Sequence, residues 1–295
     1  MPVSIYRLRR ILLCICVWTL GLALVSAVQA ASLVETPYGQ LEKRLAADGF
    51  DPAWLKTLFT RPEVHFNPKR VSGYFAHNES KLNYDQFLTP YALNRARKFV
   101  KKHQALLSRA EADYQVPGAL ITAIFLVETS LGAYTGSNRV FNTLAAMAAL
   151  SDARPRQIVW QFATKRRHLS RKKFTKKAAR KSAWAYTELT SLLTLCRKEG
   201  LDPLAIKGSY AGAIGIPQFI PSRILQLGVD GDHDGHVNLF QLEDAIPSTA
   251  NYLRHFGWKP GIDMETAQKV LYAYNHSTYY VRTLLKAAKQ INKME

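Results

Sequence analysis

The chain has 295 residues, of which 47% are hydrophobic, and its formal net charge at pH 7 is +18. This composition excludes an intrinsically disordered chain, because enough apolar residues are present to form a core. The strong positive charge favours an anionic partner, either nucleic acid or, for an exported protein, an anionic polymer or lipid headgroups.

Residues 1–30 are typical of a secretory signal peptide. Three arginines precede the apolar run ILLCICVWTLGLALVSAV, and the small residues of VQAAS offer a peptidase site. An uncleaved membrane anchor is the alternative, because the run is about long enough to span a bilayer. Cleavage would leave a net charge of +15 and Cys196 as the only cysteine, so no internal disulfide could form. We therefore expect a periplasmic or envelope-associated protein that does not bind nucleic acid.

Residues 31–295 are predicted to form one mainly α-helical domain. Apolar residues recur at helical spacing over residues 91–150 and again over 183–197, while alternating strand patterns are scarce. Residues 165–181 carry ten Lys or Arg and no acid. Two interpretations of this basic segment stay open: a solvated helix face or mobile loop, and a docking patch for an anionic envelope polymer or a membrane surface.

The segment FLVETSLG contains the candidate catalytic residue, Glu128. A helix is predicted from Pro117, which suits a first turn, to the residue before Gly132. Glu128 would share its face with Ile121 and Phe125 near the C-terminal end of this helix. Desolvation and the helix dipole would both favour the protonated acid, the form that donates a proton to a leaving oxygen. The alternative is a structural ion pair with a base such as Arg139.

Two further segments combine aromatic, amide and small residues in a way that suits a sugar-binding surface. GSYAGAIGIPQFIPS, residues 208–222, places Gln218 beside Phe219 among glycines that let backbone approach backbone or a ligand. AYNHSTYY, residues 273–280, combines tyrosines with Asn275. Structural turns and polar clusters are the alternatives at both places.

The segment DGDHDGHVNLFQLED is typical of an EF-hand calcium loop. Asp230, Asp232 and Asp234 occupy positions one, three and five, and a glycine follows at six. Position twelve holds a glutamine, so we expect the loop to close late with Asp244 and to use the carbonyl of His236. A structural calcium ion is therefore predicted, a solvated acidic turn is the alternative, and no organic cofactor is expected.

Four motifs together resemble the membrane-bound lytic transglycosylase B family of peptidoglycan-cleaving enzymes. They are VETSLGAYTGSNRVFNTLAAMA, DPLAIKGSYAGAIGIPQFIPS, VDGDHDGHVNLFQLEDAIPSTANYLRHFGW and YNHSTYY, spread over about residues 84–280. The resemblance implies a lysozyme-like fold, a calcium loop that closes with an aspartate, and Glu128 as the single acid/base. It also implies that the glycan groove is lined by Ser209, Gln218, Phe219, Tyr252, Tyr274, Asn275 and Tyr280, with Tyr84, Arg156 and Trp160 as further members.

The sequence departs from this family at two places. The basic segment 165–181 has no counterpart in the family, and the stretch between Trp258 and Tyr274 is much shorter than in relatives. A hydrolytic muramidase and a non-catalytic wall-binding protein remain as alternatives. A muramidase often needs a second carboxylate, for which Asp152 and Glu188 are the candidates. We expect a monomer whose partner is a peptidoglycan strand.

Overall fold

The computed structural model describes residues 36–75, 83–163 and 170–293. The predicted signal peptide and residues 165–169 of the basic segment lie outside this part of the chain. The α-helices are α2 (Gly39–Ala47), α3 (Pro52–Phe59), α4 (Pro68–Gly73), α5 (Pro90–Lys102), α6 (Gln104–Tyr114), α7 (Gly118–Thr129), α8 (Val140–Ala148), α9 (Ala153–Ala163), α10 (Arg171–Glu199), α11 (Pro221–Leu227), α12 (Leu242–His255), α13 (Met264–Tyr274) and α14 (Thr278–Asn292). Short 3-10 helices, η2 (Tyr84–Leu88) and η3 (Ala149–Ser151), and two strands, β1 (Asn138–Arg139) and β2 (Lys207–Gly208), complete the described elements. The predicted mainly α fold is confirmed.

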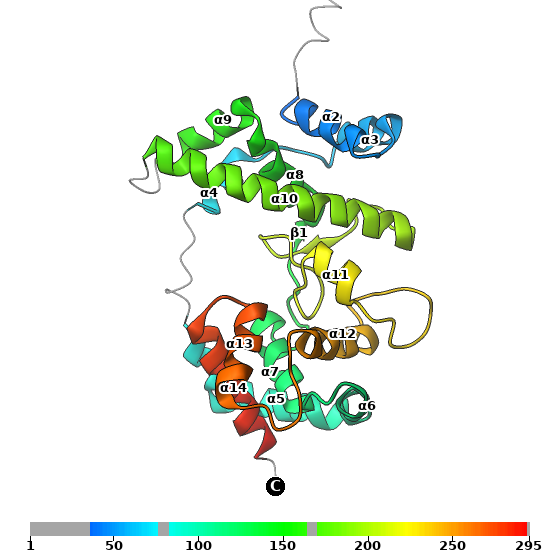
Figure 1. Cartoon of the computed structure of the whole chain (residues 1–295), viewed down its shortest axis with the longest axis vertical. Helices are drawn as coiled ribbons and strands as arrows, with labels where there is room; N and C mark the ends of the chain where they lie inside the picture. The colour runs from blue at the N-terminus through cyan, green and yellow to red at the C-terminus, as the bar shows by residue number, and fades with distance from the viewer. Residues whose placement is uncertain (1–35, 76–82, 164–169, 294–295) are drawn as a thin grey trace, which may run out of the picture.

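Most of the helices form two groups, which Figure 1 shows at opposite ends of the molecule. One group contains α2, α3, α4, α8, α9 and α10, and the other contains α5, α6, α7, α12, α13 and α14. Within the groups, α10 packs on α8 and α14 packs on α7. Each amphipathic helix buries its apolar stripe in this way; Leu93 and Phe99, for example, are buried on α5.

The two strands lie where the chain passes between the two groups (Figure 1). They pair antiparallel, with Asn138 opposite Gly208. A Cβ atom on Gly208 would lie 2.1 Å from the carbonyl oxygen of Ala213, and one on Gly136 would lie 2.1 Å from the carbonyl oxygen of Gly208. At Gly208 the sequence had left open whether backbone or ligand approaches; backbone approaches, and only glycine fits.

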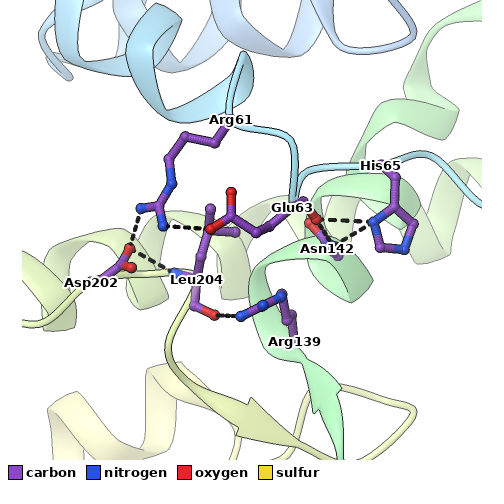
Figure 2. A network of polar contacts seen from close by, with 7 residues as sticks. All are labelled: Arg61, Glu63, His65, Arg139, Asn142, Asp202 and Leu204. Atoms are coloured by element: carbon purple, nitrogen blue, oxygen red, sulfur yellow. Dashed lines mark hydrogen bonds and ion pairs between the residues drawn. The ribbon is translucent and has the colours of Figure 1, made fainter.

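A network of polar side chains joins the first helices to this central segment (Figure 2). Arg61 donates from Nη1 to Oδ1 of Asp202 at 2.8 Å and from Nη2 to Oε1 of Glu63 at 3.1 Å. Asn142, on α8, donates to the carbonyl oxygen of Glu63 at 2.7 Å. Arg139 donates to the carbonyl oxygen of Leu204. Partly exposed ion pairs contribute little stability, so the network mainly fixes how these segments are oriented.

The basic segment belongs in part to the long helix α10. The hydroxyl of Ser170 accepts the backbone N–H of Lys173 at 3.3 Å and caps the helix, which continues to a left-handed Gly200. For residues 171–181 the structure therefore shows a helix and not a loop. Among the described residues, no helix is both long enough and apolar enough to cross a membrane.

Candidate active site

Glu128 lies in the last turn of α7 and is half-buried. The helix begins after Pro117, which occupies the N-cap position and not the first turn, and it ends at Thr129. Ser130 then takes a left-handed conformation with φ of 54°. The Thr129 hydroxyl donates to the carbonyl oxygen of Ile216 at 3.0 Å and so attaches the end of the helix to the glycine-rich segment 208–222.

Tyr280 holds the carboxylate of Glu128. The Tyr280 hydroxyl donates to Oε1 of Glu128 at 2.7 Å, and its side chain is almost fully buried. Burial, followed by the nearby Glu128 charge, raises the pKa of Tyr280 well above its ordinary value. Tyr280 therefore stays protonated near neutral pH and remains a hydrogen-bond donor to the carboxylate. The resemblance implied a groove-lining role for Tyr280, whereas the geometry makes it a positioning residue.

Arg95, on α5, binds the same end of α7. Its Nη1 donates to Oγ of Ser130 at 2.7 Å, and its Nη2 donates to the Ser130 carbonyl oxygen at 2.9 Å. A guanidinium at the C-terminal end of a helix compensates part of the negative end of the dipole. The dipole argument for a protonated Glu128 is weakened accordingly, and the hydrogen bond that Tyr280 donates favours the carboxylate. Burial beside apolar residues of α7 is the effect left that favours the protonated acid. Sequence analysis missed Arg95, because no local pattern connects it with a residue 35 positions away.

Aromatic rings pack next to the Glu128–Tyr280 pair. We call the rings of Tyr84, Phe219, Tyr252 and Tyr274 the aromatic wall. The rings of Tyr274 and Tyr280 are stacked with their centroids 6.4 Å apart, and Tyr84 meets Tyr280 edge-on at 6.5 Å. Tyr252 and Phe219 extend the wall, with centroids 4.7 Å and 5.9 Å from that of Tyr274. Both are buried, and the Tyr252 hydroxyl donates to the backbone at Ala273. These two residues therefore support the wall from within.

The polar residues expected to bind sugar differ in how much hydrogen-bonding capacity is left. Gln218 donates from Nε2 to the carbonyl oxygens of Gly215 at 2.8 Å and Thr135 at 3.2 Å, which leaves its amide oxygen for a ligand. The Ser209 hydroxyl accepts backbone N–H groups of its own turn, so its role is at least partly structural. The backbone N–H of Asn275 donates to the carbonyl oxygen of Leu271 at 3.2 Å. Its half-buried side-chain amide makes no hydrogen bond to other described residues and can bind a ligand.

Arg156 and Trp160 lie apart from Glu128. Both are on α9, which Figure 1 places in the opposite helix group from α7 and α14. Arg156 donates to the carbonyl oxygens of Leu150 and Ser151, each at 3.0 Å, and Trp160 packs against Phe174 with centroids 5.0 Å apart. These two residues can contact an extended ligand only at a part that lies far from Glu128.

The two candidate second carboxylates also have other partners. Both oxygens of Glu188, on α10, accept hydrogen bonds from Ser222 at 2.9 Å. Asp152 precedes α9 and accepts the backbone N–H of Arg154 at 3.3 Å. The structure thus places neither carboxylate on the helix group that carries Glu128.

Acidic side chains converge in the predicted calcium loop. Carboxylate oxygens of Asp230, Asp232 and Asp244 all lie within 4.8 Å of one another. Asp244, in the first turn of α12, is buried and accepts the N–H groups of Gly231 at 2.8 Å and Asn238 at 2.6 Å. Burial, and then the charges of Asp232 and Asp230, raise the pKa of Asp244. A buried carboxylate beside two others is a donor set that fits a divalent cation.

Asp234 and His236 have different positions in this loop. Asp234 lies outside the three-carboxylate group and accepts the His236 N–H at 2.8 Å. The Nδ1 atom of His236 lies 2.9 Å from Oε2 of Glu199 on α10, so this side chain points away from the loop centre and connects it to α10.

Comparisons with known proteins agree with this arrangement. The sequence profile described as "Transglycosylase SLT domain" matches residues 34–269. The chain belongs to this transglycosylase family. It is 35% identical over 176 residues to the membrane-bound lytic murein transglycosylase B of Escherichia coli strain K12. That match covers 60% of this chain but only 41% of the relative, about two fifths of its length.

Two solved structures share the fold. The soluble lytic transglycosylase SltB1 from Pseudomonas aeruginosa has a TM-score of 0.70 at 25% identity, over 86% of this chain and 97% of that one. The Escherichia coli lytic transglycosylase Slt35, solved in complex with calcium, has a TM-score of 0.68 at 23% identity, over 87% of this chain and 93% of that one.

Proposed function

We propose that this protein is a lytic murein transglycosylase that cleaves the MurNAc-GlcNAc bond of peptidoglycan and leaves 1,6-anhydro-MurNAc ends. The observation that carries the proposal is the half-buried Glu128 carboxylate, 2.7 Å from the hydroxyl of a buried tyrosine and next to an aromatic wall. Family membership supports it, and the relatives named above are lytic transglycosylases by name. A non-catalytic wall-binding protein would not need such a carboxylate.

One residue would serve both steps. Protonated Glu128 donates its proton to the glycosidic oxygen, and the C1–O bond breaks. The 2-acetamido group of the same sugar stabilises the positive charge that develops at C1. Glu128, now a carboxylate, takes the proton of the 6-hydroxyl as this oxygen attacks C1. The attacking hydroxyl is already tethered to the ring, which gives it a large effective concentration.

Sugar-binding residues would favour this internal route over water. Gln218, Tyr274 and Asn275 are proposed to hold the ring in the bent conformation that the attack requires. Ser209, Phe219, Tyr252 and Tyr84 would shape the surface beneath it. Arg156 and Trp160 would meet more distant units of the strand.

A hydrolytic muramidase is the second candidate, and the position of the carboxylates argues against it. A hydrolytic enzyme of this type often uses a second carboxylate near the first to activate water or to form a covalent intermediate. Glu188 and Asp152 are both bonded elsewhere, in the other helix group.

The experiment is digestion of purified sacculi followed by mass spectrometry of the products. The parent should release muropeptides that are lighter by one water than hydrolysed ones. Glu128→Gln should lower their yield at least about 100-fold, the lower end of a general acid/base contribution. Glu265→Gln, which changes an exposed glutamate on α13, is the matched control and should behave like the parent. Reducing-end products from the parent would identify a muramidase, and an active Glu128→Gln protein would overturn the mechanism.

A structural calcium ion is part of the proposal. Asp230, Asp232 and Asp244 supply converging carboxylates, while Asp234 and the His236 carbonyl are proposed as further ligands. The ion would neutralise the buried charge of Asp244 and attach the loop to α12. The calcium complex of Slt35 supports this assignment.

The processing, the oligomeric state and the location of the enzyme are proposed from the sequence. After removal of the signal peptide 1–30, residues 31–295 would act as one monomeric catalytic unit in the periplasm, on peptidoglycan strands. The basic segment 165–181 would be a second contact, with an anionic envelope polymer or a membrane surface. The Escherichia coli relative is membrane-bound by name, which agrees with a place in the envelope.

A further inference from the structure

The first half of α10 presents an exposed surface of one charge sign. Between residues 171 and 180, lysine or arginine is exposed at six positions, and this stretch contains no acid. The six positions are Arg171, Lys172, Lys173, Lys176, Lys177 and Arg180. We call this set the basic face of α10.

Helix geometry gathers these cations on one side. At 3.6 residues per turn, all members of the basic face except Arg171 fall within an arc of about 140°. Phe174 and Ala178 lie on the opposite side and are buried. The Phe174 ring packs against Phe75 at 4.8 Å and against Trp160 at 5.0 Å between centroids. The apolar side of the helix is therefore occupied by the protein's own core, and only the charged side is available to a partner.

The charges of the basic face are not neutralised by acids of the protein. None of the ion pairs among the described residues includes a member of this face. Lys172 and Lys176 are four residues apart, as are Lys173 and Lys177, and like charges at this spacing destabilise a helix. Cations in a first helical turn also oppose the dipole. A bound polyanion would remove both costs.

The basic face continues toward the segment that carries the proposed sugar-binding residues. The Nζ atom of Lys181 lies 5.8 Å from the centroid of the Tyr74 ring. The Tyr74 ring contacts Tyr210 at 5.6 Å, and Tyr210 is about half exposed. Tyr210 belongs to the segment 208–222, together with Gln218. Lys181, Tyr74 and Tyr210 therefore connect the helix that carries the basic face with the proposed sugar-binding segment.

We propose that the basic face of α10 binds the carboxylates of peptidoglycan peptide stems and so holds a part of the polymer distant from Glu128. The proposal rests on the proposed function, because the polymer is then the substrate itself. Peptide stems carry free carboxylates at regular intervals along a strand, which makes the polymer a polyanion that a row of lysines attracts.

A membrane surface is the less suitable partner for this face. Stable attachment of a helix to a bilayer uses apolar side chains or a second anchoring signal in addition to basic residues. In the described part of the chain, none of the large exposed apolar side chains lies within residues 171–181. The face offers charge alone.

The test measures binding to sacculi freed of other wall polymers, with every protein in the Glu128→Gln background so that nothing is digested. Replacing Lys172, Lys173, Lys176 and Lys177 by Gln should weaken binding about tenfold or more at low salt, and the difference should shrink as salt screens the charges. The matched control replaces Lys98, Lys101, Lys286 and Lys289, exposed on α5 and α14, by Gln. The control removes the same charge from the other helix group and should retain binding.

Two further arms identify the source of the anions. Amidating the carboxylates of the sacculi should reduce parent binding to the level of the quadruple Gln variant. Equal binding of parent and variant to untreated sacculi would overturn the proposal. The proposal would also be overturned, in favour of a membrane, if the quadruple Gln variant bound sacculi like the parent but bound less well to phosphatidylcholine vesicles that contain phosphatidylglycerol. If the parent forms no anhydro ends, the proposed function fails, whatever the binding result.

Discussion

At the scale of single residues, the hydrogen bond between Tyr280 and Glu128 should control activity without controlling folding. Tyr280→Phe keeps the buried ring and removes the hydroxyl that lies 2.7 Å from Oε1 of Glu128. A hydrogen bond to a charged group contributes about 1.5–3 kcal/mol, and Glu128 becomes charged as it gives its proton to the glycosidic oxygen, so kcat/KM on peptidoglycan should fall about 10- to 150-fold. The melting temperature should change much less than kcat/KM. Tyr279→Phe, at the exposed neighbour, is the control and should retain activity. Full activity in Tyr280→Phe would show that Glu128 does not need this donor.

At the scale of one element, calcium bound by the acidic loop should stabilise the folded protein. Calcium binds the folded protein preferentially. At a free calcium concentration of about 100 times Kd it should raise the free energy of unfolding by about 2.7 kcal/mol, and the melting temperature should rise accordingly. Asp244→Ala should lose this response, because Asp244 is the buried carboxylate that brings α12 to the loop. Glu243→Gln changes the exposed neighbouring acid and should keep the response. The reverse result, loss in Glu243→Gln and retention in Asp244→Ala, would mean that the loop closes through Glu243.

At the scale of the whole molecule, Glu188 connects the two helix groups. It lies on α10 and binds Ser222 at the start of α11, and α11 also packs against α12. Burial raises the pKa of Glu188 above its ordinary value of 4.5. When the pKa of a carboxyl group is higher in the folded protein than in the unfolded chain, the group contributes stability at pH values below its pKa in the unfolded chain. This contribution is lost as pH rises through its pKa in the folded protein.

The corresponding prediction concerns Glu188→Gln, which cannot titrate at this position. Its free energy of unfolding, relative to the parent, should increase as pH rises from about 4.5 through the raised pKa. Urea unfolding at a series of pH values would measure this difference. Glu265→Gln, which makes the same replacement at an exposed position, is the control. A pH-independent difference for Glu188→Gln would mean that this carboxylate is not destabilised by burial.

Local features were predictable from the sequence because each depends on neighbours along the chain. The period of apolar residues identified α7 and placed Glu128 in its last turn. Aspartates at alternate positions identified a candidate calcium loop, whose carboxylates the structure brings together at Asp230, Asp232 and Asp244. The proline and glycine positions marked where helices begin and end, to within a few residues.

Contacts between residues that are far apart in the chain could not be predicted from local sequence patterns. Tyr280 is 152 residues from Glu128, and nothing in either local pattern states that the two side chains share a hydrogen bond. The same is true of Arg95 and Ser130, and of Glu188, whose carboxylate oxygens both accept hydrogen bonds from Ser222. The helical class, the position of Glu128 in its helix and the spacing of the acidic loop could be predicted from the sequence, because these follow from helix and turn geometry within one segment. Which side chain holds the Glu128 carboxylate, and which side of α10 is left to a partner, depend on how the helices pack, and only the folded chain specifies that packing.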